Sequence, residues 1–135
     1  MDITERSTQR FENGTDVMNE LFPEEVQVGM RYIKEISPDL WNMIVSFGFG
    51  ELYAKNTLTM AQREYVTLTA LITQGAFDQL RPHLYASLRV GLTQQEITEI
   101  IIQCTGYAGF PKAVHAMGIA GEVFKNYEAE NAESK

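Results

Sequence analysis

Hydrophobic residues recur at helical spacing along most of this chain, and this pattern constrains its fold more than any other feature. The clearest case is TQQEITEIIIQCTGYA, residues 93–108. Its hydrophobic side chains fall on one helix face: Ile97, Ile100, Ile101, Cys104 and Ala108. Thr93 and Glu96 have the spacing of a capping box, in which each side chain accepts from a backbone N–H at the helix start. The segment therefore predicts an amphipathic helix with a defined beginning.

Similar patterns predict further helices over residues 23–36, 39–54, 59–73 and 78–90, and after Pro111. Ser37 is placed to cap the start of the second of these, and the first twenty residues are long enough for another helix. No segment alternates as a strand does. We therefore predict an all-α protein, a single domain over residues 1–135 with about six helices. Its acidic tail is expected to fray from about residue 127.

The chain length and the cysteine content limit which stabilising cross-links and which thiolate sites the protein can have. A chain of 135 residues can bury about 65–70% of the surface that its unfolded form exposes, so it needs neither disulfides nor a structural metal. The single cysteine, Cys104, excludes an intrachain disulfide and any site built from several thiolates. Its place on a hydrophobic helix face predicts an inert, buried thiol. This composition suits a reducing, cytoplasmic compartment.

Charge and hydropathy argue against two classes of partner. The net charge is −7, with 18 acidic and 11 basic residues, and no cluster of lysine and arginine offsets it. Nucleic-acid binding relies on neutralising phosphates, so we expect none. No hydrophobic run approaches the roughly 20 residues that span a bilayer, and the polar N-terminus lacks the core of a signal peptide. We expect a soluble protein without membrane contact.

His83, in the segment LRPHL, is the first candidate for chemistry. Histidine titrates near neutrality, so His83 is a possible general acid or base, although a half-buried structural histidine fits the same pattern. Glu64 lies in the second turn of the 59–73 helix, where a surface carboxylate is also common. Because the connection to the 78–90 helix is short, we expect the two helices to pack antiparallel, with Glu64 near His83.

Several cations are candidate anchors for a carboxylate substrate: Arg63, Arg81, Arg89 and Lys112. Arginine suits this role because its planar guanidinium binds a carboxylate with two parallel hydrogen bonds. Each of them, taken alone, also fits a solvated surface charge. We interpret the second histidine, His115, as structural or as part of an interface, and we expect no metal site.

Four segments together resemble the carboxymuconolactone decarboxylase family: FGELYA (49–54), Arg63-Glu64, LRPHLYASLRVGLTQQEI (80–97) and YAGFPKAVHAMGIAGEVF (107–124). The resemblance covers roughly residues 9–126. It implies an all-α helical bundle of the carboxymuconolactone decarboxylase or alkylhydroperoxidase D-like type. It also implies a homo-oligomer, either a hexamer or a trimer.

One branch of the family resembles alkylhydroperoxidase D, with the motif E-x₁₁-C-x₂-C-x₃-H. That spacing falls here on Glu64, Ala76, Gln79 and His83, so the glutamate and the histidine match and both cysteines are missing. Dithiol peroxidase chemistry needs one thiolate to attack the peroxide and a second thiol to resolve the product. Cys104 cannot replace both, so this chemistry is excluded.

The other branch is the decarboxylase proper, with E-L-R-x-H-L around its histidine. Residues 79–84 read QLRPHL, so glutamine replaces the first glutamate of that motif. Glu64 is a second departure, because decarboxylases often have serine there. The resemblance implies a cofactor-independent decarboxylase that converts a γ-carboxymuconolactone-like lactone carboxylate into an enol-lactone, in aromatic-compound catabolism.

Under this resemblance, His83 is the proton donor or the group that stabilises the dienolate, and Glu64 orients it. Arg81 or Arg63 would hold a substrate carboxylate, and a pocket wall would include Tyr107 and Phe110. Two alternatives stay open: a related enzyme acting on another small carboxylic acid, and a non-catalytic ring-forming protein. The non-catalytic alternative predicts that Glu64 and His83 are not hydrogen-bonded neighbours in a cavity.

Overall fold

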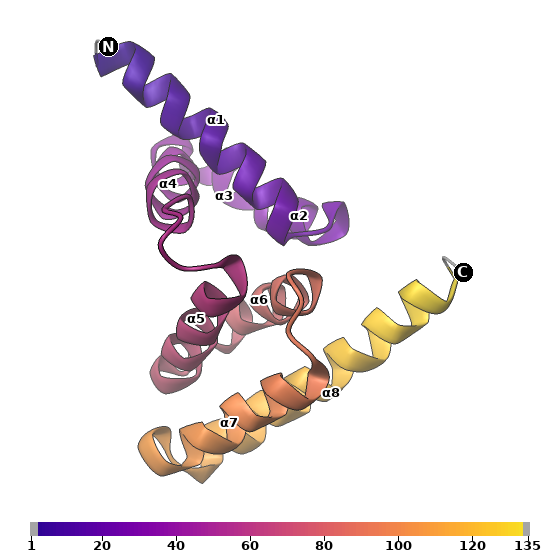
Figure 1. Cartoon of the computed structure of the whole chain (residues 1–135). Helices are drawn as coiled ribbons and strands as arrows, with labels where there is room; N and C mark the ends of the chain where they lie inside the picture. The colour runs from indigo at the N-terminus through magenta and orange to yellow at the C-terminus, as the bar shows by residue number, and fades with distance from the viewer. Residues whose placement is uncertain (1–2, 134–135) are drawn as a thin grey trace. The chain divides into compact units, whose positions relative to one another are not determined.

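A computed structural model describes residues 3–133, and this part of the chain contains helices and no strand, which confirms the all-α prediction. The elements are α1 (Ile3–Leu21), α2 (Glu24–Met30), α3 (Tyr32–Ile36), α4 (Pro38–Met43), the π-helix η1 (Ile44–Tyr53), α5 (Met60–Gln74), α6 (Phe77–Arg89), α7 (Gln94–Ala108) and α8 (Phe110–Glu133) (Figure 1). Contacts within the chain group into two compact units, one up to Met60 and one from Ala61. A single domain over residues 1–135 stays a prediction.

In the first unit, α1 packs closely against η1. The two backbones approach at two glycines: a Cβ on Gly14 would lie 1.9 Å from the carbonyl oxygen of Val45, and one on Gly50 would lie 2.1 Å from that of Arg10. An ion pair between Arg10 Nε and Glu51 Oε1, at 2.7 Å, also joins the two helices. The crossing therefore depends on the absence of a side chain at both glycines.

We expect Gly14→Ala to lower the free energy of unfolding by about 3 kcal/mol, because the new Cβ would overlap backbone that cannot move aside locally. Urea unfolding of the variant would measure this. Gly29→Ala is the matched control, since a Cβ on Gly29 meets nothing within 4 Å. It should be neutral or stabilising by up to about 1 kcal/mol. Equal stability of the two variants would contradict the close crossing.

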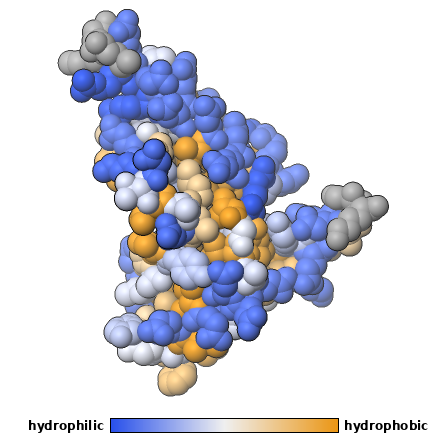
Figure 2. Space-filling view, viewed as in Figure 1, coloured by the Kyte–Doolittle hydropathy of each residue, from blue (hydrophilic) through white to orange (hydrophobic). Residues whose placement is uncertain are grey.

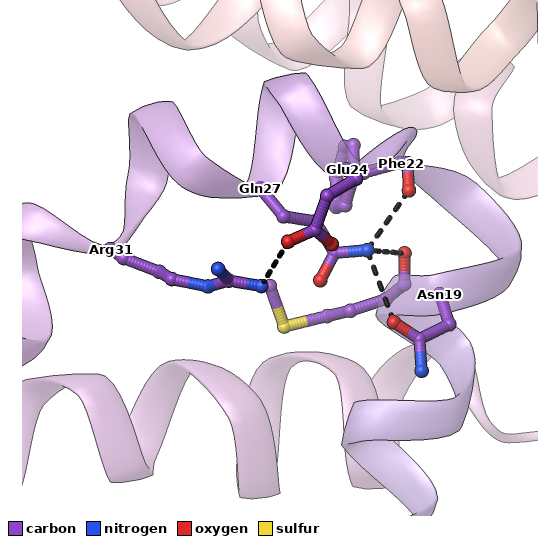
Figure 3. A network of polar contacts seen from close by, with 6 residues as sticks. Asn19, Phe22, Glu24, Gln27 and Arg31 are labelled. Atoms are coloured by element: carbon purple, nitrogen blue, oxygen red, sulfur yellow. Dashed lines mark hydrogen bonds and ion pairs between the residues drawn. The ribbon is translucent and has the colours of Figure 1, made fainter.

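A buried glutamine holds the junction between α1 and α2. Gln27 Nε2 lies within hydrogen-bond distance of the backbone oxygens of Phe22 (3.0 Å) and Met18 (3.4 Å) and of Asn19 Oδ1 (3.1 Å). Figure 3 shows these contacts beside the ion pair of Arg31 with Glu24. Phe22 directly follows the last residue of α1, and Gln27 supplies a donor to its carbonyl at this helix end.

Two predicted helices of this unit are each divided. The 23–36 helix breaks at Arg31, between α2 and α3, and the 39–54 helix consists of α4 followed by η1. The predicted cap at Ser37 is confirmed, because its hydroxyl accepts from the N–H of Leu40 at 3.2 Å. The wide π turn of η1 was not predicted.

In the second unit, α5 to α8 enclose one hydrophobic core, and α7 and α8 lie side by side (Figure 1). The predicted interior positions Ile97, Ile100, Ile101 and Cys104 are all buried. The capping box of Thr93 and Glu96 is confirmed by both of its hydrogen bonds, at 3.0 and 3.1 Å. These four helices supply the candidate active site.

Two details of the second unit differ from expectation. α6 begins at Phe77, one residue before the expected start at 78, so that Pro82 lies in its second turn. α8 continues through Glu133, beyond the expected fraying point near residue 127. One contact that holds this segment is the hydrogen bond from Gln94 Nε2 to Glu128 Oε1, at 2.8 Å.

A short hydrogen bond joins α5 to α7. The hydroxyl of Tyr65 donates to Glu96 Oε2 at 2.5 Å. This bond, followed by the one from the Thr93 backbone N–H, lowers the pKa of the Glu96 carboxyl, while the same bond with Glu96 raises the pKa of the Tyr65 hydroxyl. The contact therefore requires a charged carboxylate and a neutral phenol.

These pKa shifts predict how stability depends on pH. The contribution of Glu96 is present above its unfolded pKa of about 4.3 and is lost as the pH falls through the lowered folded pKa. The contribution of Tyr65 is present below about pH 10 and is lost as the pH rises through its raised folded pKa. We expect Tyr65→Phe to weaken the pH dependence of the melting temperature in both the acidic and the alkaline range, with Tyr32→Phe as an exposed control. An unchanged pH dependence in this variant would contradict this account.

Candidate active site

Glu64 on α5 and His83 on α6 are hydrogen-bonded across 19 positions of sequence. His83 Nδ1 lies 3.1 Å from Glu64 Oε2 and 3.3 Å from Oε1. Gly75, with φ of +74°, ends α5 in a left-handed conformation that favours glycine and lets the chain turn into α6. The expectation that these two helices bring Glu64 to His83 is confirmed.

The two side chains differ in their access to solvent. The side chain of Glu64 is fully buried, whereas 13% of the His83 side chain is exposed. An ionised Glu64 can only accept hydrogen bonds, so the Nδ1 atom that faces it must carry the hydrogen. The carboxylate thus fixes the orientation and tautomer of the ring. A solute can reach the pair through the imidazole and not through the carboxylate.

Ser87 completes the surroundings of the pair. It is fully buried one turn after His83, with its Oγ 2.6 Å from the backbone oxygen of His83 and 3.5 Å from Glu64 Oε2. Its single hydrogen serves the shorter of these contacts. Ser87 lies four positions after His83 in the sequence, and no role was predicted for it.

Arg81 does not pair with Glu64. Its Nη2 lies 2.6 Å from Glu122 Oε2, and both residues line a polar cavity of about 560 Å³ with Asp78 and His115. Arg63 directly precedes Glu64 on α5 and is partly buried. Lys112, another candidate anchor, donates from Nζ to the backbone oxygen of Thr73 at 2.8 Å.

The two predicted aromatic wall residues are on the surface. Tyr107, at the end of α7, is 83% exposed, and Phe110, at the start of α8, is 72% exposed. Tyr107 lines a hydrophobic cavity of about 910 Å³ between α5 and α7. Neither this cavity nor the polar one is lined by Glu64, His83 or Phe110. The roles given to Tyr107 and Phe110 by the resemblance stay predictions.

Cys104 and a possible metal site are the remaining candidates for chemistry. Cys104 is buried, and this burial raises the pKa of its thiol, which fits the predicted inert role. Among residues 3–133, no group of three or more histidine, cysteine, aspartate and glutamate side chains is arranged to hold a metal ion. In the same part of the chain, no helix combines the length and the hydrophobicity needed to cross a membrane.

Comparison with known proteins places this site in context. The family model described as "Carboxymuconolactone decarboxylase family" matches residues 38–122, which include both Glu64 and His83. A protein of Acinetobacter baylyi named 4-carboxymuconolactone decarboxylase is 35% identical over 119 residues, covering 87% of this chain and 89% of that protein.

Two further relatives are more distant. A nitrosuccinic acid decarboxylase of Metarhizium robertsii is 26% identical over 108 residues, covering 79% of this chain and 76% of that protein. An uncharacterized 15.0 kDa protein of Paracoccus denitrificans is 27% identical over 124 residues, covering 90% and 92%. The family match and the similarity to the Acinetobacter protein agree with the all-α fold, and this chain belongs to the carboxymuconolactone decarboxylase family.

Proposed function

We propose that the protein is a cofactor-independent decarboxylase acting on a γ-carboxymuconolactone-like lactone carboxylate and giving an enol-lactone. The observation that carries the proposal is the hydrogen bond between the buried carboxylate of Glu64 and the partly exposed imidazole of His83. The non-catalytic alternative predicted that the two would not be hydrogen-bonded neighbours in a cavity. The bond argues against that alternative, whereas neither of the two cavities described above is lined by the pair. The similarity to a 4-carboxymuconolactone decarboxylase supports the choice of substrate class.

The reaction needs an electron acceptor and a proton, and the substrate supplies the first. When the bond between the ring carbon and its carboxylate breaks, CO₂ leaves and the electron pair moves into conjugation with the lactone carbonyl as a dienolate. Protonation of the carbon next to that carbonyl then gives the enol-lactone. The protein must therefore hold the substrate, stabilise the dienolate and deliver one proton to carbon.

His83 is suited to the last two of these tasks. With Nδ1 directed at Glu64, the other ring nitrogen, Nε2, would donate a hydrogen bond to the dienolate or a proton to the ring. Glu64 is a positioning residue in this scheme, because it lies buried behind the imidazole. Solvent would return the proton to His83 after each turnover.

A cation must also hold a carboxylate of the substrate. Arg63 and Arg81 are the residues that the family resemblance assigns to this task. Arg81 pairs with Glu122 at a site where the two side chains are 44% and 65% exposed, and an exposed ion pair of this kind contributes only about 0–1 kcal/mol. A substrate carboxylate could therefore replace Glu122 at little cost.

A second substrate class is favoured by one relative. The Metarhizium protein is named for nitrosuccinic acid, a dicarboxylic acid in which a carboxylate stands next to an electron-withdrawing nitro group. Loss of that carboxylate would place the electrons on the nitro group, as the lactone carbonyl accepts them in the first proposal. A small carboxylic acid with such an adjacent acceptor is the alternative substrate.

The test is direct incubation of the purified protein with γ-carboxymuconolactone and, separately, with nitrosuccinate, following the release of CO₂. Release from the lactone alone supports the first proposal, and release from nitrosuccinate alone supports the alternative. If a folded protein released CO₂ from neither, above the rate of the blank, the proposed activity would be wrong. The family membership would be unaffected.

A further inference from the structure

The tautomer of His83 makes its ring a base as well as an acid. Nδ1 lies 3.1 and 3.3 Å from the two carboxylate oxygens of Glu64, and an ionised carboxylate can only accept, so Nδ1 carries the hydrogen of the neutral ring. The lone pair of the neutral ring is then on Nε2, the nitrogen that does not face Glu64. Histidine titrates near neutrality, so both protonation states of such a ring are available. The nitrogen that delivers a proton in one state can therefore remove a proton in the other.

The surroundings of His83 favour proton transfer over attack on a lactone carbonyl. Opening a lactone by covalent catalysis needs an accessible nucleophile that the base can activate. Ser87 is fully buried, and its hydroxyl donates to the backbone oxygen of His83 at 2.6 Å. The Cys104 thiol is buried as well, and burial raises its pKa. Neither side chain is therefore available as that nucleophile.

The enol-lactone that decarboxylation would give is itself a substrate for such a base. Its ring has a CH₂ group next to the lactone carbonyl. Loss of a proton from this group gives the same dienolate as loss of CO₂ from the parent lactone. The enol-lactone carries one carboxylate, whereas γ-carboxymuconolactone carries two. Hydrophilic side chains cover much of the face shown in Figure 2, and the chain has a net charge of −7, so the protein repels the enol-lactone less.

We propose that the pair of Glu64 and His83 also exchanges protons between solvent and enol-lactones that have no ring carboxylate to lose. First, the C–H bond next to the carbonyl breaks, the proton moves to Nε2 of the neutral ring, and the electron pair enters the dienolate. The adjacent carboxylate of Glu64 stabilises the imidazolium that forms. After its Nε2 hydrogen has exchanged with solvent, the imidazolium returns a proton to the same carbon. The lactone is regenerated, and nothing is oxidised or reduced.

This activity rests on the proposed function, because its first step is the reverse of the protonation that ends decarboxylation. It makes one further demand on the geometry. A single imidazole can lie on only one side of the planar dienolate, so it removes and returns a proton on that side alone. We therefore expect the protein to exchange one of the two CH₂ hydrogens, whereas solvent exchanges both.

Deuterium uptake measures the exchange without any decarboxylation. The purified protein is incubated in D₂O with the enol-lactone, and the CH₂ signal is followed by proton NMR against a blank without protein. The protein is expected to speed the loss of one hydrogen by roughly 100-fold or more, as general acid–base catalysis usually does. His83→Gln should lose this acceleration. His115→Gln, the matched histidine control, should keep it at saturating lactone.

Carbon dioxide release from γ-carboxymuconolactone, measured on the same preparation, separates this activity from the proposed function. Release of CO₂ with deuterium uptake at the blank rate would overturn the exchange and leave the decarboxylase proposal standing. Deuterium uptake without CO₂ release would support the exchange and oppose the decarboxylase. Equal uptake at both hydrogens, or protein-dependent opening of the lactone ring in place of uptake, would overturn the assignment of His83 as a base that only transfers protons.

Discussion

His83→Gln is expected to lower kcat for decarboxylation by about 100- to 10,000-fold, the usual contribution of general acid–base catalysis. Glutamine is chosen because its amide N–H can still donate to the buried carboxylate of Glu64. His83→Ala would leave that carboxylate without this donor, at a cost of about 3–5 kcal/mol if the pair is ionic. Loss of activity in the glutamine variant therefore reports on proton transfer and not on unfolding.

The second histidine provides the control. His115 lies on α8, with its ring 4.0 Å from that of Phe77, and it lines the polar cavity that holds Arg81. His115→Gln should keep wild-type kcat, because His115 takes no part in the proposed proton transfer; an effect on KM alone is compatible with its place in the cavity of the candidate anchor Arg81. Activity would be measured as CO₂ release from the substrate that the wild type turns over, and folding by circular dichroism. A folded His83→Gln protein with full kcat would show that His83 is not the proton donor.

The helix positions could be predicted best where local chemistry fixes both ends. For the 93–108 helix, Thr93 and Glu96 cap the start and Gly109, at φ of +94°, ends it, so prediction and structure differ by one residue. No comparable signal in the sequence predicted the π-helix η1. Its sequence, IVSFGFGELY, is hydrophobic on more than one side, and its close crossing with α1 at Gly14 depends on packing between distant segments.

The same distinction applies to the site. Glu64 and His83 could be paired from the sequence because a short connection joins their helices. The contact of Arg81 with Glu122 could not, since 41 positions separate them and many carboxylates compete for an exposed arginine. The resemblance named Tyr107 and Phe110 as residues of a pocket wall but did not predict that both side chains are exposed. Exposure depends on which neighbouring helix covers a side chain, and sequence periodicity does not determine this.

Glu64→Gln is expected to lower kcat by about 10- to 100-fold, as happens when carboxylates that orient metal-bound histidines are replaced. The change keeps the volume of the buried side chain, so the packing around it should survive. It removes the charge and offers the imidazole an amide that can either accept or donate. The ring is then no longer restricted to one tautomer. Steady-state kinetics would give the loss, with Glu25→Gln on the exposed surface of α2 as control.

The role of Glu64 as a positioning residue leads to a sharper expectation for the double variant. If Glu64 acts only through His83, Glu64→Gln should have little further effect on kcat once His83 is glutamine, because the interaction it supported is already lost. Non-additivity of this kind separates positioning from an independent contribution. An equal 10- to 100-fold loss in both backgrounds would mean that Glu64 acts on the substrate by another route. In that case the buried carboxylate would have to be reached by the substrate itself, which its complete burial in this structure opposes.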